Sequence, residues 1–252
     1  GEDADPGEYR MGPTVAGAYE SWLTSLDGGS RQRKVRAVGL TYPAEHVKKL
    51  PLEREKYFKG LDKGVNAAVD LLEDGAKVCP KQRYVLAGYS QGAMVAHRAL
   101  WKLSRGKTFP MARIDGVILV ADGDRHSGQG GAAQYGTATN GKGVSWLVPA
   151  LAGIKHKPTK GFPIAATKIH SVCLDYDVVC DTNLAHFNAP LTVRAAGAAN
   201  HLKYKPGKQA HKYVQRAAKA VAKLTTSHPI PTSPQIVTST LPGAKVGTVY
   251  DQ

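Results

Sequence analysis

Hydrophobic positions along the chain alternate between short continuous runs and longer stretches with helical spacing. The continuous runs predict buried strands, at 34–40, 83–88, 114–121 and 168–174. The periodic stretches predict amphipathic helices, at 52–74, 91–103 and 209–224, and Gly75 is expected to close the first of them. Strands that alternate with helices in this way are typical of an α/β fold, a three-layer α/β/α sandwich around a mainly parallel sheet.

Two long segments, 122–167 and 182–200, lack clear periodicity and are predicted as loops. Loops of such length are often binding loops or lids. After Leu224 a proline-rich stretch begins, which predicts a stiff linker. We therefore expect an α/β domain over 1–226, a linker over 227–235 and a tail over 236–252.

The charge of the chain is strongly positive. Its 252 residues include 34 Lys and Arg against 20 Asp and Glu, and 182–250 contains no acidic residue but nine basic ones. Such a segment predicts a basic face, either merely solvated or suited to anionic polymers or acidic lipid headgroups. Only Tyr204 and Tyr213 are interleaved with these charges, so we expect no nucleic-acid partner. No apolar run reaches the 18 residues of a membrane span.

The three cysteines, Cys79, Cys173 and Cys180, form an odd set. Cys173 and Cys180 enclose a short segment, and a local disulfide fits this pair better than two free thiols. A second pair of metal ligands at zinc-site spacing is missing, so we expect no metal and no cofactor. A disulfide would indicate export, because cytosolic thiols are kept reduced.

Residues 88–92 read Gly-Tyr-Ser-Gln-Gly, the G-x-S-x-G pattern, between a predicted buried strand and a predicted helix. This context is that of a nucleophile elbow, in which the serine oxygen projects from a sharp strand-to-helix turn. Ser90 is therefore the candidate nucleophile. The backbone N–H of Gln91 is the candidate oxyanion donor.

A serine nucleophile needs a carboxylate and a histidine, which follow the serine in that order in α/β hydrolases. Asp177 lies between the two cysteines, with Asp175 and Asp181 as alternatives. His186 and His201 both precede the last helix, and spacing alone leaves them nearly even. Other histidines are expected to be ordinary core or surface residues, and His211 a solvated helix residue.

Four ordered motifs strengthen this hypothesis: Val78-Cys79-Pro80, residues 88–93, the segment from Cys173 to Cys180, and residues 200–204. Together they resemble the cutinase family of secreted serine esterases, of actinobacterial type, across roughly residues 9 to 224. The resemblance implies a hydrolase-type sheet and a triad of Ser90, Asp177 and His201. In that family the acid stands three residues before the second cysteine, and the histidine is commonly followed by an apolar residue and, shortly after, by Tyr. The resemblance therefore favours Asp177 over Asp175 and His201 over His186.

The resemblance also implies that the family's first strand and second oxyanion donor precede Gly1 and have been trimmed. Cys79 would pair with the cysteine of that missing element. At the other end, residues 235–252 resemble the opening strand of a bacterial immunoglobulin-like repeat. A disordered tail is the alternative.

The function expected from these features is hydrolysis of lipid, polyester or cell-envelope esters by a secreted or cell-envelope-associated monomer. We expect the substrate site to be lined by apolar and aromatic side chains, namely Tyr42, Tyr89, Trp146, Leu184 and Phe187. The alternatives are a non-catalytic cell-envelope binding module on the same fold, and a transacylase or peptidase with the same triad.

Overall fold

The structure, a computed structural model, describes residues 11–26, 35–45, 53–126, 131–138, 141–147, 161–182 and 190–227. Four strands form one sheet in the order β1-β2-β4-β3: β1 (Tyr84–Tyr89), β2 (Ile114–Val120), β4 (Ile169–Cys173) and β3 (Ala133–Gly136). Every pairing is parallel. The predicted mainly parallel α/β sheet is therefore confirmed.

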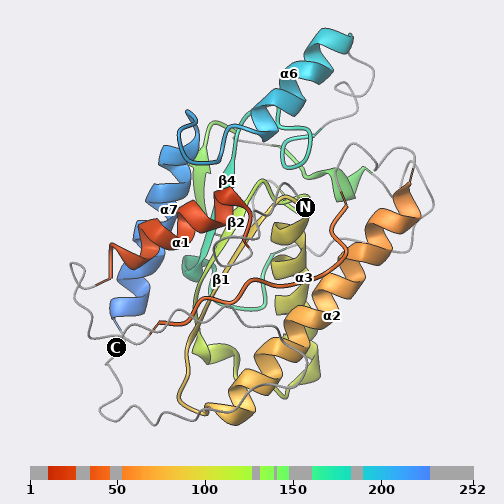
Figure 1. Cartoon of the computed structure of the whole chain (residues 1–252). Helices are drawn as coiled ribbons and strands as arrows, with labels where there is room; N and C mark the ends of the chain where they lie inside the picture. Colours follow the sequence, from red (N-terminus) through yellow and green to blue (C-terminus); the bar gives the residue numbers. More distant parts are fainter. Residues whose placement is uncertain are drawn as a thin grey trace.

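Helices cover both faces of this sheet (Figure 1). One face packs against α2 (Arg54–Val78) and α3 (Gln91–Gly106), and the other against α1 (Pro13–Leu23) and α7 (His211–Thr226). The central strand β2 is buried along its whole length, since each face meets a helical layer. Short 3₁₀ turns complete the described elements: η3 (Met111–Arg113), η4 (Val144–Trp146) and η5 (Ala166–Lys168).

The prediction of a strand at 34–40 is wrong for residues 35–40, which the structure describes. Residues 35–40 have no strand assignment, although they alternate between more and less exposed positions as an extended chain does. An extended segment becomes a strand only when its backbone pairs with a neighbour. Val35 and Leu40 instead contact the two hydrophobic cores by their side chains.

Gly75 does not close the helix that precedes β1. The helix continues to Val78, and a Cβ at Gly75 would lie 3.1 Å from the hydroxyl oxygen of Tyr84. The glycine thus lets α2 approach β1 closely. Cys79 caps the helix and is a free, half-buried thiol.

Both predicted long loops contain regular structure. The first contains the edge strand β3, whose four residues are too few to show a period. The second contains α6 (Leu191–His201). Its run of small residues hides the helical pattern, and Gly197 is required because a Cβ there would lie 2.7 Å from the carbonyl oxygen of Tyr176. Helix α1 was also not among the elements predicted from the sequence.

The predicted linker and immunoglobulin-like tail, at 227–235 and 236–252, lie outside the described residues except for Ser227. The domain boundaries remain predictions. Within the described residues, no helix is both long and apolar enough to cross a membrane.

Candidate active site

Ser90 occupies the single-residue turn between β1 and α3. Its backbone has φ 55° and ψ −122°, a conformation that side-chain-bearing residues rarely adopt. The Ser90 N–H donates to the carbonyl of Val120 at 2.9 Å, which anchors the strained residue to the central strand. A Cβ at Gly88 would lie 2.3 Å from the carbonyl oxygen of Gly92, whereas one at Gly92 would meet nothing closer than 3.7 Å. Gly88 is therefore the glycine that the tight turn requires.

The side chains of Ser90, His201 and Asp177 form one continuous hydrogen-bonded chain. Nε2 of His201 lies 2.9 Å from Oγ of Ser90. Nδ1 of His201 lies 3.0 and 3.1 Å from the two carboxylate oxygens of Asp177. His201 and Asp177 are both buried. This is the arrangement in which a histidine removes a proton from a serine hydroxyl while a carboxylate fixes the imidazole tautomer.

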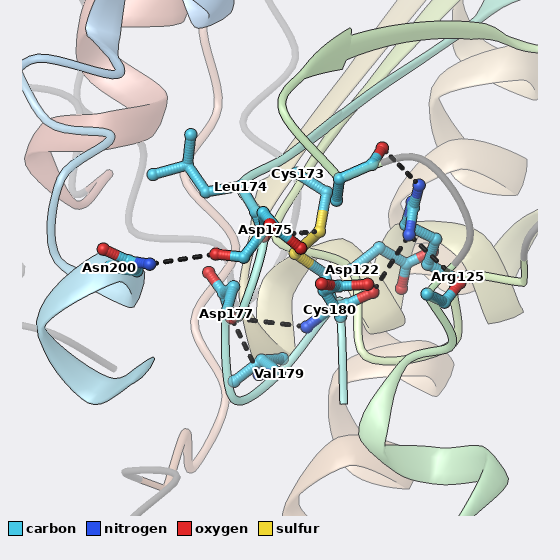
Figure 2. Close-up of a disulfide and its surroundings, with 12 residues drawn as sticks. Asp122, Arg125, Cys173, Leu174, Asp175, Asp177, Val179, Cys180 and Asn200 are labelled. Carbon is cyan, nitrogen blue, oxygen red and sulfur yellow. Dashed lines mark hydrogen bonds between the residues drawn. A yellow bond between two sulfur atoms is a disulfide. The ribbon is translucent and has the colours of Figure 1, made fainter. Parts of the chain in front are cut away.

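A tight turn closed by a disulfide holds the carboxylate of Asp177 (Figure 2). Cys173, the last residue of β4, is bonded to Cys180, as predicted. Inside this loop Asp177 accepts hydrogen bonds from the backbone N–H groups of Val179 at 2.7 Å and Cys180 at 3.3 Å. The buried guanidinium of Arg125 donates to the carbonyl of Cys180, which ties the loop to the segment after β2. The acid is thus fixed by backbone and crosslink together.

Tyr204 is a residue of this site whose role sequence reasoning missed. Its fully buried hydroxyl donates to Asp177 at 2.8 Å and accepts from the N–H of Leu174 at 2.8 Å. The motif of residues 200–204 contained this tyrosine, but only the fold shows that its hydroxyl reaches the acid. The phenol bonds Oδ2 of Asp177 while the backbone N–H groups of the loop bond Oδ1, and together they fix the rotamer of Asp177.

Burial by itself would raise the pKa of Asp177. The opposing effects of the His201 charge, the hydrogen bond from His201 and those from Val179 and Tyr204 outweigh burial and lower it below its ordinary value. Burial and the neighbouring Asp177 raise the pKa of Tyr204 well above its ordinary value, so Tyr204 stays a proton donor. Asp177 is therefore an ionised acceptor at neutral pH.

Gln91, the first residue of α3, is anchored by its side chain. Its amide group donates to the carbonyl of Tyr57 at 3.1 Å and accepts from the N–H of Glu45 at 3.0 Å. The first N–H groups of a helix have no partner inside it, so the Gln91 N–H is available beside Ser90 for a developing negative charge.

The residues predicted to line the substrate site lie in different places. The ring of Tyr89 stacks on His201 with 5.1 Å between centroids, and its hydroxyl donates to the His201 carbonyl. Tyr42 packs between α2 and α3, where burial raises its pKa to about 12. Trp146 donates to the carbonyl of Asp124 at 3.0 Å. Leu184 and Phe187 lie outside the described residues.

Among the remaining histidines, His97 and His170 are core residues, as expected. The expectation of a solvated His211 is wrong: its Nδ1 lies 3.0 Å from the Tyr204 carbonyl oxygen, and its ring packs beneath Gly17 of α1. His186, the alternative base, lies outside the described residues.

One group of side chains, His97, Asp122 and Asp124, has ligand atoms within 4.8 Å of one another and is buried. Its charges are already matched by neighbouring side chains. Nδ1 of His97 lies 2.7 Å from Asp122, and Arg98 donates to both carboxylate oxygens of Asp124 at 2.6 and 2.8 Å. Since the guanidinium occupies the Asp124 carboxylate, the group is an internal ion network and a poor cation site.

Comparison with known proteins places this geometry in a family. The curated relatives include "Carboxylesterase Culp6 homolog" of Corynebacterium glutamicum, 29% identical over 135 residues, which are 48% of this chain and 42% of that protein. They also include "Cutinase 4" of Emericella nidulans, 38% identical over 97 residues, which are 38% of each chain. The aligned region thus spans about two fifths of the length of the curated relatives it matches.

Solved structures share the fold. An acetyl xylan esterase matches with a TM-score of 0.55 and 19% identity, over 83% of this chain and 89% of the other. A cutinase-like protein from Cryptococcus sp. matches with a TM-score of 0.54 and 22% identity, over 87% and 90%. The family model described as Cutinase matches residues 4–218, well over half of the sequence. The chain therefore belongs to the cutinase family.

Proposed function

We propose that this protein is a secreted serine esterase that hydrolyses carboxylic esters through Ser90, His201 and Asp177. The observation that carries the proposal is the chain of hydrogen bonds from Ser90 Oγ through the His201 imidazole to Asp177. Family membership supports the same reaction class. The Cys173–Cys180 disulfide supports export to an oxidising compartment.

In the proposed reaction the Ser90 oxygen attacks the acyl carbon while Nε2 of His201 removes its proton. The tetrahedral oxyanion is stabilised by the Gln91 N–H, and His201 returns the proton to the departing alcohol. A water molecule then attacks the acyl carbon while His201 removes its proton. The bond to the Ser90 oxygen breaks, His201 returns the proton to that oxygen, and the carboxylic acid is released. Asp177 stays ionised throughout and stabilises the imidazolium.

A binding module that merely kept the fold would need neither the strained Ser90 backbone nor an aligned base. These features favour catalysis over the non-catalytic alternative. Hydrolysis and acyl transfer share every residue of the site and differ only in the acceptor. The actinobacterial assignment within the family stays a prediction.

The test combines labelling and turnover. A fluorophosphonate probe should label the wild type at Ser90, and a series of p-nitrophenyl esters of increasing acyl length should report the chain preference. Ser90→Ala should abolish labelling and lower kcat by about 10³-fold or more, because triad members act as a unit. Ser104→Ala is the matched control, since this α3 hydroxyl bonds only the Trp101 carbonyl among the described residues. Near-normal turnover by Ser90→Ala would overturn the assignment.

A further inference from the structure

A stripe of positive charge runs along the exposed face of α7. Lys212, Arg216, Lys219 and Lys223 recur at intervals of four, three and four residues, so they share one face of the helix. All four are exposed, and the stripe extends over roughly 16 Å at the rise of an α-helix. Lys205 and Lys208, also exposed, continue it into the turn before α7.

This charge has little compensation nearby. Residues 190–227 contain no Asp or Glu, and among the described residues none of the four α7 cations forms an ion pair. Helix α1, which packs beside α7 (Figure 1), contributes the exposed carboxylate of Glu20. Several like charges in a row create a field that attracts an extended polyanion.

Helix α7 offers charge without a large exposed apolar side chain of its own, and Leu202, in the turn before it, is the large exposed apolar residue beside the stripe among the described residues of 190–227. Five apolar residues of α7 are buried against the sheet, namely Val214, Ala217, Ala218, Val221 and Ala222, and no large hydrophobic side chain of α7 is exposed. Helices that lie in a membrane surface insert apolar side chains, which α7 has already used for the core. The ring of Tyr213 lies beneath the Lys212 ammonium, 5.1 Å from its centroid, so it is no open platform for stacking bases. A water-soluble polyanion fits this face best.

The start of α7 lies close to the acid of the triad, because His211 bonds the carbonyl of Tyr204, whose hydroxyl bonds Asp177. The turn before α7 begins directly after His201, and a hollow of about 270 Å³ lies where the two meet. Its walls include Tyr176 and Asn200, the sequence neighbours of Asp177 and His201, together with Tyr213 of α7. Thr137, Asn200 and Gln209 contribute hydroxyl and amide groups to it, Tyr176 contributes an aromatic ring, and Lys203 and Asp175 contribute one charge of each sign. Such a mixture suits sugar rings, which offer both hydroxyl groups and apolar faces.

We propose that the ester substrate is carried by an anionic polysaccharide, whose carboxylates lie along the α7 stripe while an esterified sugar is held near Ser90. This inference rests on the proposed esterase function and adds the substrate class. Because the attraction is between exposed charges, it should weaken steeply with salt.

Acetylated polygalacturonate, acetylated xylan and p-nitrophenyl acetate separate the polymer contact from the chemistry. The wild type should release acetate from the acidic polymer with a kcat/KM roughly tenfold or more above that for the neutral polymer at low salt. A quadruple variant, Lys212→Gln, Arg216→Gln, Lys219→Gln and Lys223→Gln, should lose this preference and keep its p-nitrophenyl acetate turnover. A control with Lys59→Gln, Lys63→Gln, Lys81→Gln and Lys107→Gln removes the same charge from exposed lysines in and near α2 and α3, and should keep the preference.

Binding of de-esterified polygalacturonate to Ser90→Ala tests the surface without any turnover. Binding that weakens in the α7 variant and with added salt supports the proposal, even if the protein hydrolysed no ester and the proposed function failed. Equal kcat/KM for the acidic and neutral polymers in the wild type would overturn it. So would vesicles of anionic lipid, or duplex DNA, binding through the stripe more tightly than the polyuronate does.

Discussion

Two buried histidine–aspartate pairs lie in this protein, and they differ in what faces the second ring nitrogen. Nδ1 of His201 lies 3.0 Å from Asp177, and Nδ1 of His97 lies 2.7 Å from Asp122. Nε2 of His201 lies against the hydroxyl of Ser90. The corresponding atom of His97 is buried without a hydrogen bond to any nucleophilic side chain among the described residues. The comparison teaches that a histidine–carboxylate contact alone does not define a catalytic base.

The electrostatics of the two pairs differ as well. Burial opposes a charged His97, but Asp122, its hydrogen bond and Asp124 together raise the pKa of His97 above its ordinary value. A general base must be neutral before it accepts a proton. Around Asp177, by contrast, Tyr204 and two backbone N–H groups already share the negative charge. His97 is thus suited to a structural ion pair, and His201 to proton transfer.

The strongest test of this contrast exchanges each histidine for glutamine. His201→Gln should lower kcat for a p-nitrophenyl ester by about 10³-fold or more, since the serine loses its base. His97→Gln should leave kcat within a few fold and lower the melting temperature instead. Steady-state kinetics and thermal melts of both variants measure the two effects.

Loss of turnover in His97→Gln with a native melting curve would contradict the contrast. The same assay addresses His186, which lies outside the described residues. His186→Ala is expected to alter KM more than kcat, and activity lost there but kept in His201→Ala would make His186 the base.

The second prediction concerns the Cys173–Cys180 disulfide, which closes the loop that holds Asp177 and has no counterpart at Asp122. Replacing Cys173 and Cys180 by Ser should lower the free energy of unfolding by about 2.5 kcal/mol, the loop-closure entropy of so short a ring. Chemical denaturation measures this, and Cys79→Ser, which removes a free thiol, is the matched control. Unchanged stability in the double variant would show that hydrogen bonds alone order the loop.

Much of the nucleophile side of the site could be predicted from sequence, because its determinants are local. A buried strand, one glycine pattern and an amphipathic helix place Ser90 within a few residues. The positions of Asp177 and His201, by contrast, depend on contacts between residues that are far apart in the sequence. His201 ends a helix that small residues conceal, and Gly197 matters only because α6 lies on the turn at Tyr176.

The strand expected at 34–40 failed for a related reason. Its alternation is real, but a strand also needs a partner, and no pattern within one segment indicates whether a partner is present. The role of Tyr204 was hidden in the same way, since its hydroxyl reaches Asp177 across 27 positions of sequence.

The third prediction isolates the hydrogen bond that Tyr204 adds to the catalytic pair. Tyr204→Phe should lower kcat roughly tenfold with little change in KM, because one charge-assisted hydrogen bond to the carboxylate is lost and the ring is kept. The pKa of Asp177 should then rise, since the Tyr204 hydrogen bond helps to lower it. A carboxylate with one donor fewer attracts a protonated imidazole more strongly, so the acid limb of the kcat–pH profile, which reports protonation of the base, should move to higher pH. Tyr135→Phe, which removes a hydroxyl 3.0 Å from His170, is the control. An unchanged pH profile and kcat would limit Tyr204 to packing.

The smallest effect is a difference in how stability depends on pH. Because the folded pKa of His97 is raised above the unfolded value of about 6.5, its stabilising charge is fully present below that pH and is lost as pH rises through the folded pKa. The difference in unfolding free energy between wild type and His97→Gln should therefore narrow as pH increases from 6 to 9.

His170 should show the opposite dependence of stability on pH, since burial lowers its pKa. Wild type should lose stability relative to His170→Gln as pH falls below about 6.5. Urea denaturation across this range measures both stability differences. If the difference for His97→Gln widened as pH rises, His97 would be neutral in the folded protein. The electrostatic difference between His97 and His201 would then not exist.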